Sequence, residues 1–178
     1  MTLEEYISSL KDKRVAVVGV GVSNRPLIEL LLSAGIPISL RDQRGEEKLG
    51  AEAEDYRKRG AEVTLGAGYL SGLDGYDVIF RTPGVLPTEP ALVSAAAHGA
   101  EITSEMEAFF RLCPCLPIGI TGSDGKTTTS SIIAELLRAA GRNVYLGGNI
   151  GKPLLASVPE VRPGDIAVLG LSRFQPHR

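Results

Sequence analysis

Residues 117–141 read PIGITGSDGKTTTSSIIAELLRAAG, and this stretch decides the fold of the second half of the chain. A short apolar run, residues 118–120, precedes a turn rich in Gly and Ser, which leads to Lys126, a row of hydroxyl side chains and an amphipathic segment. That order is typical of a strand, a loop and a helix. The stretch therefore predicts an α/β unit whose first loop can bind phosphate.

This loop carries the residue types that phosphate binding requires. Gly122 and Gly125 would let backbone N–H groups turn toward phosphate oxygens, and the start of the following helix adds its own donors. Lys126 would reach the outer phosphates and Thr127 could hold Mg²⁺, so both are candidates for the catalytic centre. The spacing TGxxGKT is shorter than the general P-loop, because Ile120 stands where that pattern has glycine. A glycine turn beside an exposed lysine is the alternative interpretation.

Composition limits the possible partners and location. The 178 residues are 43% apolar and 22% charged, which is ordinary for a soluble globular protein. The net charge is −2, Lys and Arg are scattered and Trp is absent, so no nucleic acid partner is expected. The N-terminus has charges where a signal peptide needs an apolar core, and no later run reaches membrane-spanning length. We therefore expect a cytoplasmic protein with no membrane partner.

The chain has two cysteines, Cys113 and Cys115, on either side of Pro114. They are too close for an ordinary disulfide between separate elements and too few for a zinc site. This spacing favours plain thiols, buried or at the surface. His98 and His177 have no neighbours at metal-ligand spacing, and we assign neither a role.

Strand and helix patterns alternate through the first hundred residues. Strands are predicted at 14–20, 37–40, 62–65 and 77–80, and helices near the N-terminus and at 25–34, 46–59 and 91–98. Alternation at this spacing predicts βαβ units and a mostly parallel sheet. We therefore expect residues 1–103 to form a Rossmann-like α/β domain with a parallel sheet.

The second half begins with a recognisable helix start. Ser104 is expected to cap a helix over residues 105–112, with Glu107 at the capping-box position. After the phosphate loop and its helix, the patterns predict a strand at 143–145, a short helix and a strand at 166–171. Residues 104–178 are therefore expected to form an incomplete P-loop-type α/β ATP-binding domain, small by domain standards.

A second glycine loop, GVGVSN, ends the first predicted strand, and Asp42 follows about twenty residues later, as in a dinucleotide fingerprint. Asn24 occupies the third glycine position, which weakens the NAD interpretation. The loop still suits an anion at a helix N-terminus, with Ser23 and Asn24 as additional donors. Asp42 and Arg44 could read a sugar hydroxyl or a base edge. A nucleotide diphosphate fits as well as NAD, and a tight turn without ligand remains an alternative.

Six motifs taken together resemble a known family. GVGVSN, DQR, TPGV, TGSDGKTTT, GGNIGKP and VLGLSRFQ occur in the order and approximate spacing of the Mur ligases, with the strongest resemblance to members that add D-glutamate. Folylpolyglutamate synthases share the shortened phosphate loop, but they begin almost directly with the ATP domain. The resemblance implies an ATP- and Mg²⁺-dependent carboxylate-amine ligase of peptidoglycan precursor synthesis. Its small-molecule substrates would be UDP-N-acetylmuramoyl-L-alanine and D-glutamate, joined through an acyl phosphate.

The resemblance also implies roles for individual residues. The UDP-linked substrate would be held by Gly21, Val22, Ser23, Asn24, Asp42, Arg44, Pro83, Gly84 and Asn149. ATP would be held by Gly122, Ser123, Asp124, Gly125, Lys126, Thr127 and Thr128, with Thr127 also directed toward Mg²⁺.

Two features depart from the family pattern. The family usually reads VLELSSFQL near its final strand, whereas this chain has Gly170 in place of the Glu and Arg173 in place of the second Ser. Losing a carboxylate beside a hard cation should weaken metal binding. The chain also ends at Arg178, so we expect an amino-terminal portion of a ligase, cut by truncation or a frameshift, that binds nucleotide without ligating.

Two other classes remain as alternatives. An NAD-type dinucleotide-binding oxidoreductase or sensor module is favoured by GVGV and Asp42 but leaves the phosphate loop unexplained. A P-loop kinase or GTPase is opposed by Ile120.

Overall fold

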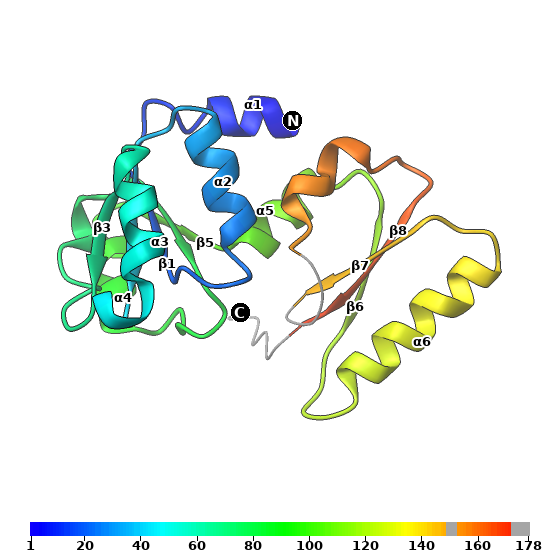
Figure 1. Cartoon of the computed structure of the whole chain (residues 1–178). Coiled ribbons are helices and arrows are strands. Elements are labelled where there is room, and N and C mark those ends of the chain that lie inside the picture. Colours follow the sequence, from blue (N-terminus) through cyan, green and yellow to red (C-terminus); the bar gives the residue numbers. More distant parts are fainter. Residues whose placement is uncertain (149–152, 172–178) are drawn as a thin grey trace.

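The computed structural model of the chain describes residues 1–148 and 153–171, which contain two parallel β-sheets. The first sheet has the order β3-β2-β1-β4-β5, and all its pairings are parallel (Figure 1). Its strands are β1 (Val15–Val18), β2 (Ile38–Asp42), β3 (Glu62–Leu65), β4 (Val78–Arg81) and β5 (Glu101–Thr103). Every residue of β1 and β2 is buried, as expected for central strands covered on both faces.

Helices cover both faces of this sheet. They are α1 (Leu3–Ser8), α2 (Arg25–Ser33), α3 (Glu46–Lys58) and α4 (Pro90–Ala97), with the short 3-10 helix η1 (Leu73–Gly75) before β4. Val15 and Val17 face the core that contains α2 and α3, whereas Ala16 and Val18 face the core beneath α4. The side-chain alternation of one strand therefore supplies both hydrophobic layers.

The second sheet has the parallel order β6-β8-β7. Its strands are β6 (Leu116–Ile120), β7 (Val144–Gly148) and β8 (Ile166–Gly170), and α6 (Lys126–Ala139) packs on one face. Pro117 lies in β6, which is tolerated because β6 is an edge strand of the described sheet. Central β8 is buried throughout, with Ile166 and Val168 facing α6.

Two helical elements pack between the sheets. Helix α5 (Glu105–Leu112) and the 3-10 helix η2 (Leu155–Glu160) lie between them in Figure 1, and η2 contacts both α5 and α2. Phe109 of α5, Leu155 of η2 and Leu169 of β8 belong to the same hydrophobic core as Leu31 of α2. The apolar core is therefore continuous from the first sheet to the second.

The predicted α/β class with parallel sheets is confirmed. Helix α5 has the predicted bounds, and Ser104 caps it by accepting a hydrogen bond from the Glu107 N–H at 3.2 Å. The Glu107 carboxylate accepts from the Ser104 hydroxyl rather than from the cap backbone, so the reciprocal half of the expected capping box differs. The first-half strand β5 was not predicted, and the expected short helix is the 3-10 helix η2. No helix within the described ranges has the length and apolarity to cross a membrane.

Candidate functional site

The first candidate site lies at the carboxyl edge of the five-stranded sheet. Strand β1 pairs with β2 on one side and with β4 on the other. The sheet therefore grows from β1 through β2 to β3 in one direction, and through β4 to β5 in the opposite direction. Open α/β sheets bind ligands at such a switch point, outside the carboxyl ends of the strands. The loop after β1, residues Asp42 and Arg44, and the segment after β4 therefore lie at the same edge of the sheet.

Gly19 allows two of these segments to approach closely. Its φ of +94° lies in the region that favours glycine, and an added Cβ would stand 2.6 Å from Cγ2 of Thr82. The Gly19 N–H donates to the Arg41 carbonyl at 2.6 Å, and the Thr82 N–H donates to the Val18 carbonyl at 2.8 Å. These contacts hold Pro83 and Gly84, both exposed, beside the first glycine loop.

Asp42 and Arg44 brace the glycine loop from the adjacent strand. The Asp42 Oδ2 atom accepts from the buried Val20 N–H at 2.7 Å and from Arg44 Nη2 at 2.7 Å, while Oδ1 accepts from Arg44 Nε at 2.9 Å. Arg44 Nη2 also donates to the Val20 carbonyl at 2.6 Å. Burial raises the pKa of Asp42, but hydrogen bonds from Arg44 and from the Val20 N–H outweigh it and lower the pKa below its ordinary value.

Asn24 has a structural role that the sequence did not indicate. Its side chain is 1% exposed, and Nδ2 donates to the carbonyls of Gly19 at 2.9 Å and Val18 at 3.2 Å. The amide N–H groups expected to meet a ligand therefore secure the strand end beneath the loop. Val22 stands at the loop surface with 69% exposure, whereas Gly21 and Ser23 are half-buried.

The second candidate site lies where β6 meets α6. Residues 121–125 are exposed, and Gly125 forms the helix N-cap with φ +74° and no side-chain cap. The first backbone N–H groups of α6 therefore have no partner from a capping side chain and suit an anion. Lys126 Nζ donates to the carbonyls of Gly122 at 2.6 Å and Ser123 at 2.9 Å. In this position Lys126 ties the start of α6 back to the loop that precedes it.

The remaining nucleotide-loop residues are placed at the same end of α6. Ser123, Asp124, Thr127 and Thr128 are exposed, and Thr127 is the second residue of the helix. These donors suit the phosphate groups of a nucleoside triphosphate, because they combine one ammonium, free helix amides and hydroxyl groups. The one acid in the set, Asp124, is exposed.

Glycines shape the neighbouring strand ends. Gly148 has φ +112°, and an added Cβ would overlap the carbonyl oxygen of Gly170, which pairs with it in the sheet. A Cβ on Gly170 would lie 3.5 Å from Oγ of Ser130, which is ordinary contact. Ser130 Oγ is buried and has no hydrogen-bond partner within the part of the chain that the structure describes. A Cβ at residue 170 would therefore lie beside that Ser130 hydroxyl without a clash.

Metal ligands are sparse. Among residues 1–148 and 153–171, no group of three or more His, Cys, Asp or Glu side chains could hold a metal ion. Thr127, the residue predicted to bind Mg²⁺, is exposed at the second position of α6. The predicted substrate residue Asn149 and the departure at Arg173 lie outside the described residues.

Sequence reasoning missed two residues beside these sites. Thr82 fixes the spacing of the first site through its contact with Gly19. Glu105, in the first turn of α5, is 5% exposed and contacts η2. The signal available for Thr82 was its place immediately after a buried strand; Glu105 offered none.

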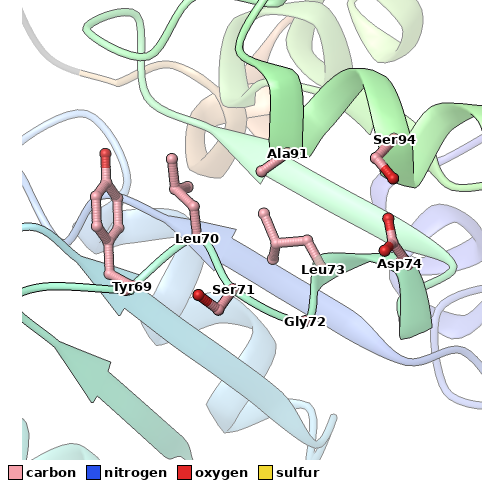
Figure 2. A pocket seen from close by; sticks show the side chains of 9 residues that line it. Tyr69, Leu70, Ser71, Gly72, Leu73, Asp74, Ala91 and Ser94 are labelled. Atoms are coloured by element: carbon pink, nitrogen blue, oxygen red, sulfur yellow. The ribbon is translucent and has the colours of Figure 1, made fainter.

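Two hollows lie away from both glycine loops. One, of about 420 Å³, lies between the β3–β4 connection and α4, where Figure 2 shows Leu73 and Asp74 beneath Ala91 and Ser94. The other, of about 640 Å³, lies at the amino ends of the strands, beside Arg14, Ser39 and Glu62. Neither contains a predicted ligand-binding residue.

Family comparisons cover both parts of the chain. Residues 13–104 match the family model described as Mur ligase MurD-like, N-terminal domain, and residues 120–173 match the model described as Mur ligase middle domain. The chain is 49% identical over 173 residues to a UDP-N-acetylmuramoylalanine–D-glutamate ligase of Ruminiclostridium cellulolyticum, covering 97% of this chain and 37% of the relative. It is 45% identical to the protein of that name from Clostridium novyi, covering 98% of this chain and 38% of the relative.

Solved structures give a weaker likeness. The chain is similar to a pseudomurein peptide ligase type C from Methanothermus fervidus, with 26% identity, a TM-score of 0.45 and coverage of 91% of this chain and 33% of that one. The chain spans less than two-fifths of the length of these two ligases from Ruminiclostridium cellulolyticum and Clostridium novyi.

Proposed function

The chain belongs to the Mur ligase family, and from that premise we propose that it supplies the precursor-binding and nucleotide-binding loops of a ligase that adds D-glutamate to UDP-N-acetylmuramoyl-L-alanine. One observation carries the proposal: each of two parallel sheets in this chain presents a glycine loop at its strand ends. A ligase that joins a UDP-linked carboxylate to an amine needs one anion site for the precursor and one for the nucleotide. A dinucleotide-binding protein with a single ligand site would not require the second glycine loop.

The first loop is proposed to hold the UDP group through Gly21, Val22, Ser23 and the edge formed by Pro83 and Gly84. Asp42 and Arg44 act in this site by fixing the loop, because both Asp42 oxygens accept hydrogen bonds from Arg44. In an NAD site the equivalent acid binds the ribose hydroxyls. Here that carboxylate is turned to the Val20 N–H, which favours a UDP-linked ligand over NAD. Asn149 is proposed to face the same substrate.

The second loop is proposed to hold ATP with Mg²⁺. Bound ATP would supply the phosphoryl group that activates the substrate carboxylate. Lys126 would exchange its two loop carbonyls for phosphate oxygens, and the amides at the start of α6 would stabilise the negative charge. Thr127 directs its hydroxyl to the metal ion. Gly122 and Gly125 keep the backbone close enough for these contacts.

Each of the two sheets is proposed to belong to a domain that binds one substrate. Residues 1–103 form the precursor-binding domain and residues 104–178 the beginning of the nucleotide-binding domain. The reaction is proposed to occur in the cytoplasm, where ATP and UDP-linked precursors are available. D-Glutamate is proposed as the second small-molecule substrate, and no residue described here is assigned to it.

Calorimetric titration of this chain with UDP-N-acetylmuramoyl-L-alanine, and separately with NADH, tests the first site. Binding of the UDP-linked precursor with no binding of NADH is expected. An Arg44→Ala variant should weaken the precursor affinity, whereas an Arg142→Ala variant, altered at an exposed residue of the second unit, should leave it unchanged. NADH binding in preference to the precursor would overturn the proposal in favour of an oxidoreductase or sensor module.

A further inference from the structure

The connector between α5 and β6 holds two thiols in contact. Cys113 is the C-cap of α5, and its N–H donates to the Phe109 carbonyl at 2.8 Å. Beyond Pro114, Cys115 is followed by Leu116, whose N–H donates to the Asp165 carbonyl at 3.3 Å. The Sγ atoms of Cys113 and Cys115 lie 2.7 Å apart, and both cysteines are free. The connector is therefore held at both ends with its sulfur atoms facing each other.

The backbone explains why cysteines one residue apart can meet here. Cys113 leaves the helix in an extended conformation, with φ −69° and ψ 122°, so its side chain is no longer on the helical path. Pro114 has a ring-restricted φ, which limits the conformations of the connector. The spacing argument against a disulfide considered separate elements, whereas this pair lies within one short connector.

We propose that Cys113 and Cys115 are a reversible dithiol–disulfide modification site, oxidised by low-molecular-weight disulfides of the glutathione class. The inference is independent of the ligase function proposed above. It rests on the paired sulfur atoms, their unequal exposure and their position in the connector between the two sheets.

The reaction balances as two thiol–disulfide exchanges. The Cys113 thiolate attacks one sulfur of oxidised glutathione, forming a protein–glutathione bond and releasing one glutathione thiolate, which takes up a proton. Cys115 then loses its proton to solvent and attacks Sγ of Cys113, which breaks the mixed disulfide and releases the second glutathione. The two protein thiols are oxidised and one molecule of oxidised glutathione is reduced to two of glutathione.

The order of attack follows from burial. Cys113 is half-buried, whereas Cys115 is 7% exposed. Burial and the hydrogen bond with Cys113 raise the pKa of Cys115 to about 12, so it is a poor first nucleophile. Once Cys113 carries glutathione, Cys115 remains beside the sulfur that it must attack. Cys113 is therefore the entry thiol and Cys115 the resolving thiol.

Thiol counting on the intact chain tests this inference, because Cys113 and Cys115 are its two cysteines. The chain is incubated with oxidised glutathione, quenched with acid, treated with a maleimide and weighed by mass spectrometry. The expected product is a monomer that has lost two hydrogen atoms, carries no glutathione and no maleimide, and recovers both thiols with dithiothreitol. In a Cys115→Ser variant the glutathione adduct on Cys113 should accumulate, and a Cys113→Ser variant should react at least about tenfold more slowly, because its remaining thiol is buried.

The same assay in denaturant separates folded geometry from sequence proximity. Closure of the mixed disulfide should be at least about tenfold faster in the folded chain, because fixed geometry raises effective concentration. Equal closure rates, persistent glutathione adducts on the folded chain, disulfide-linked dimers or two unreacted thiols would each overturn the proposal.

Discussion

The carboxylate of Glu105 accepts a hydrogen bond from the backbone N–H of Leu155 at 2.6 Å, across fifty residues of sequence. Glu105 begins α5 and Leu155 begins η2, so this buried contact ties the element after the first sheet to the element before β8. Burial raises the pKa of Glu105, and the backbone N–H groups of Leu155 and Leu154 oppose that rise only in part.

Replacing Glu105 with Ala should destabilise the chain by about 1–3 kcal/mol, because the buried Leu155 N–H would lose its acceptor. Glu105→Gln retains an acceptor oxygen and should cost less. Chemical denaturation of both variants measures the difference. Equal stability of the Ala variant and the parent chain would show that the contact contributes nothing.

The raised pKa of Glu105 also predicts a pH dependence. The folded chain holds this proton more tightly than the unfolded chain, so the contribution of Glu105 to stability falls as pH rises from the ordinary carboxyl pKa of 4.5 through the raised folded value. The Gln variant does not titrate. The stability of the parent relative to Glu105→Gln should therefore decline over that interval, and a rise would contradict the assignment.

Asp42 predicts the opposite sign. Its folded pKa lies below its ordinary value of 3.8, so the stability that it contributes is present above that pH and is lost as pH falls through the folded pKa. Asp42→Asn should cost about 1–3 kcal/mol at neutral pH, because hydrogen bonds to the charged group are lost, and should reduce the acid sensitivity. Denaturation across the acid range measures both effects; an unchanged acid limb would exclude Asp42 as its source.

Local patterns predicted most of the elements, because strand burial and helix amphipathicity repeat within a few residues. Strand β3 and helix α5 have the predicted bounds. Strand β5 was missed because three residues, EIT, are too short for a periodic signal, and it exists through parallel pairing with β4. Helix η2 likewise depends on packing against α5 and α2.

The candidate sites were predictable as positions but not as contacts. Glycine spacing identified both loops. That Asp42 turns to the Val20 N–H, that Asn24 is buried, and that the two thiols meet all depend on neighbours brought together by the fold. Such contacts between different segments leave no periodic signal in a single sequence.

Lys126 is expected to be the main cationic contact of the nucleotide. Lys126→Met should weaken ATP binding about 10- to 100-fold, the amount expected when a charge-assisted hydrogen bond is removed. Because Lys126 is held by carbonyls of its own loop, the same variant should change stability little. Fluorescent ATP-analogue titration measures affinity, with Arg142→Ala as control. Unchanged affinity would remove Lys126 from the site.

Gly148→Ala tests the close approach of β7 and β8. The φ of +112° disfavours a side chain, and the added methyl would overlap the Gly170 carbonyl, so a loss of about 2–4 kcal/mol is expected. Gly164→Ala is the matched control, because open space surrounds an added Cβ there. Thermal unfolding compares the two variants, and equal melting temperatures would contradict the predicted packing.

Gly170 is the position where this chain lacks the carboxylate of the family pattern, and a Cβ added there makes only an ordinary contact. A Cβ at residue 170 would meet Ser130 Oγ at 3.5 Å, and Thr127 lies one turn earlier on the same face of α6, nearer the phosphate loop. A Glu at residue 170 is expected to extend from Ser130 along α6 toward Thr127, the predicted Mg²⁺ ligand. Carboxylate oxygen is the ligand type that Mg²⁺ prefers.

Gly170→Glu should therefore make ATP binding more dependent on Mg²⁺. The ratio of the ATP affinity in excess Mg²⁺ to the affinity in chelator should rise about tenfold, as expected for one additional charged ligand. Gly170→Gln has nearly the same size without the charge and should behave like the parent chain. Calorimetric titration of all three proteins, with and without Mg²⁺, decides the matter. If Glu and Gln give the same Mg²⁺ dependence, the side chain at residue 170 does not reach the metal, and Thr127 must be completed by residues from elsewhere.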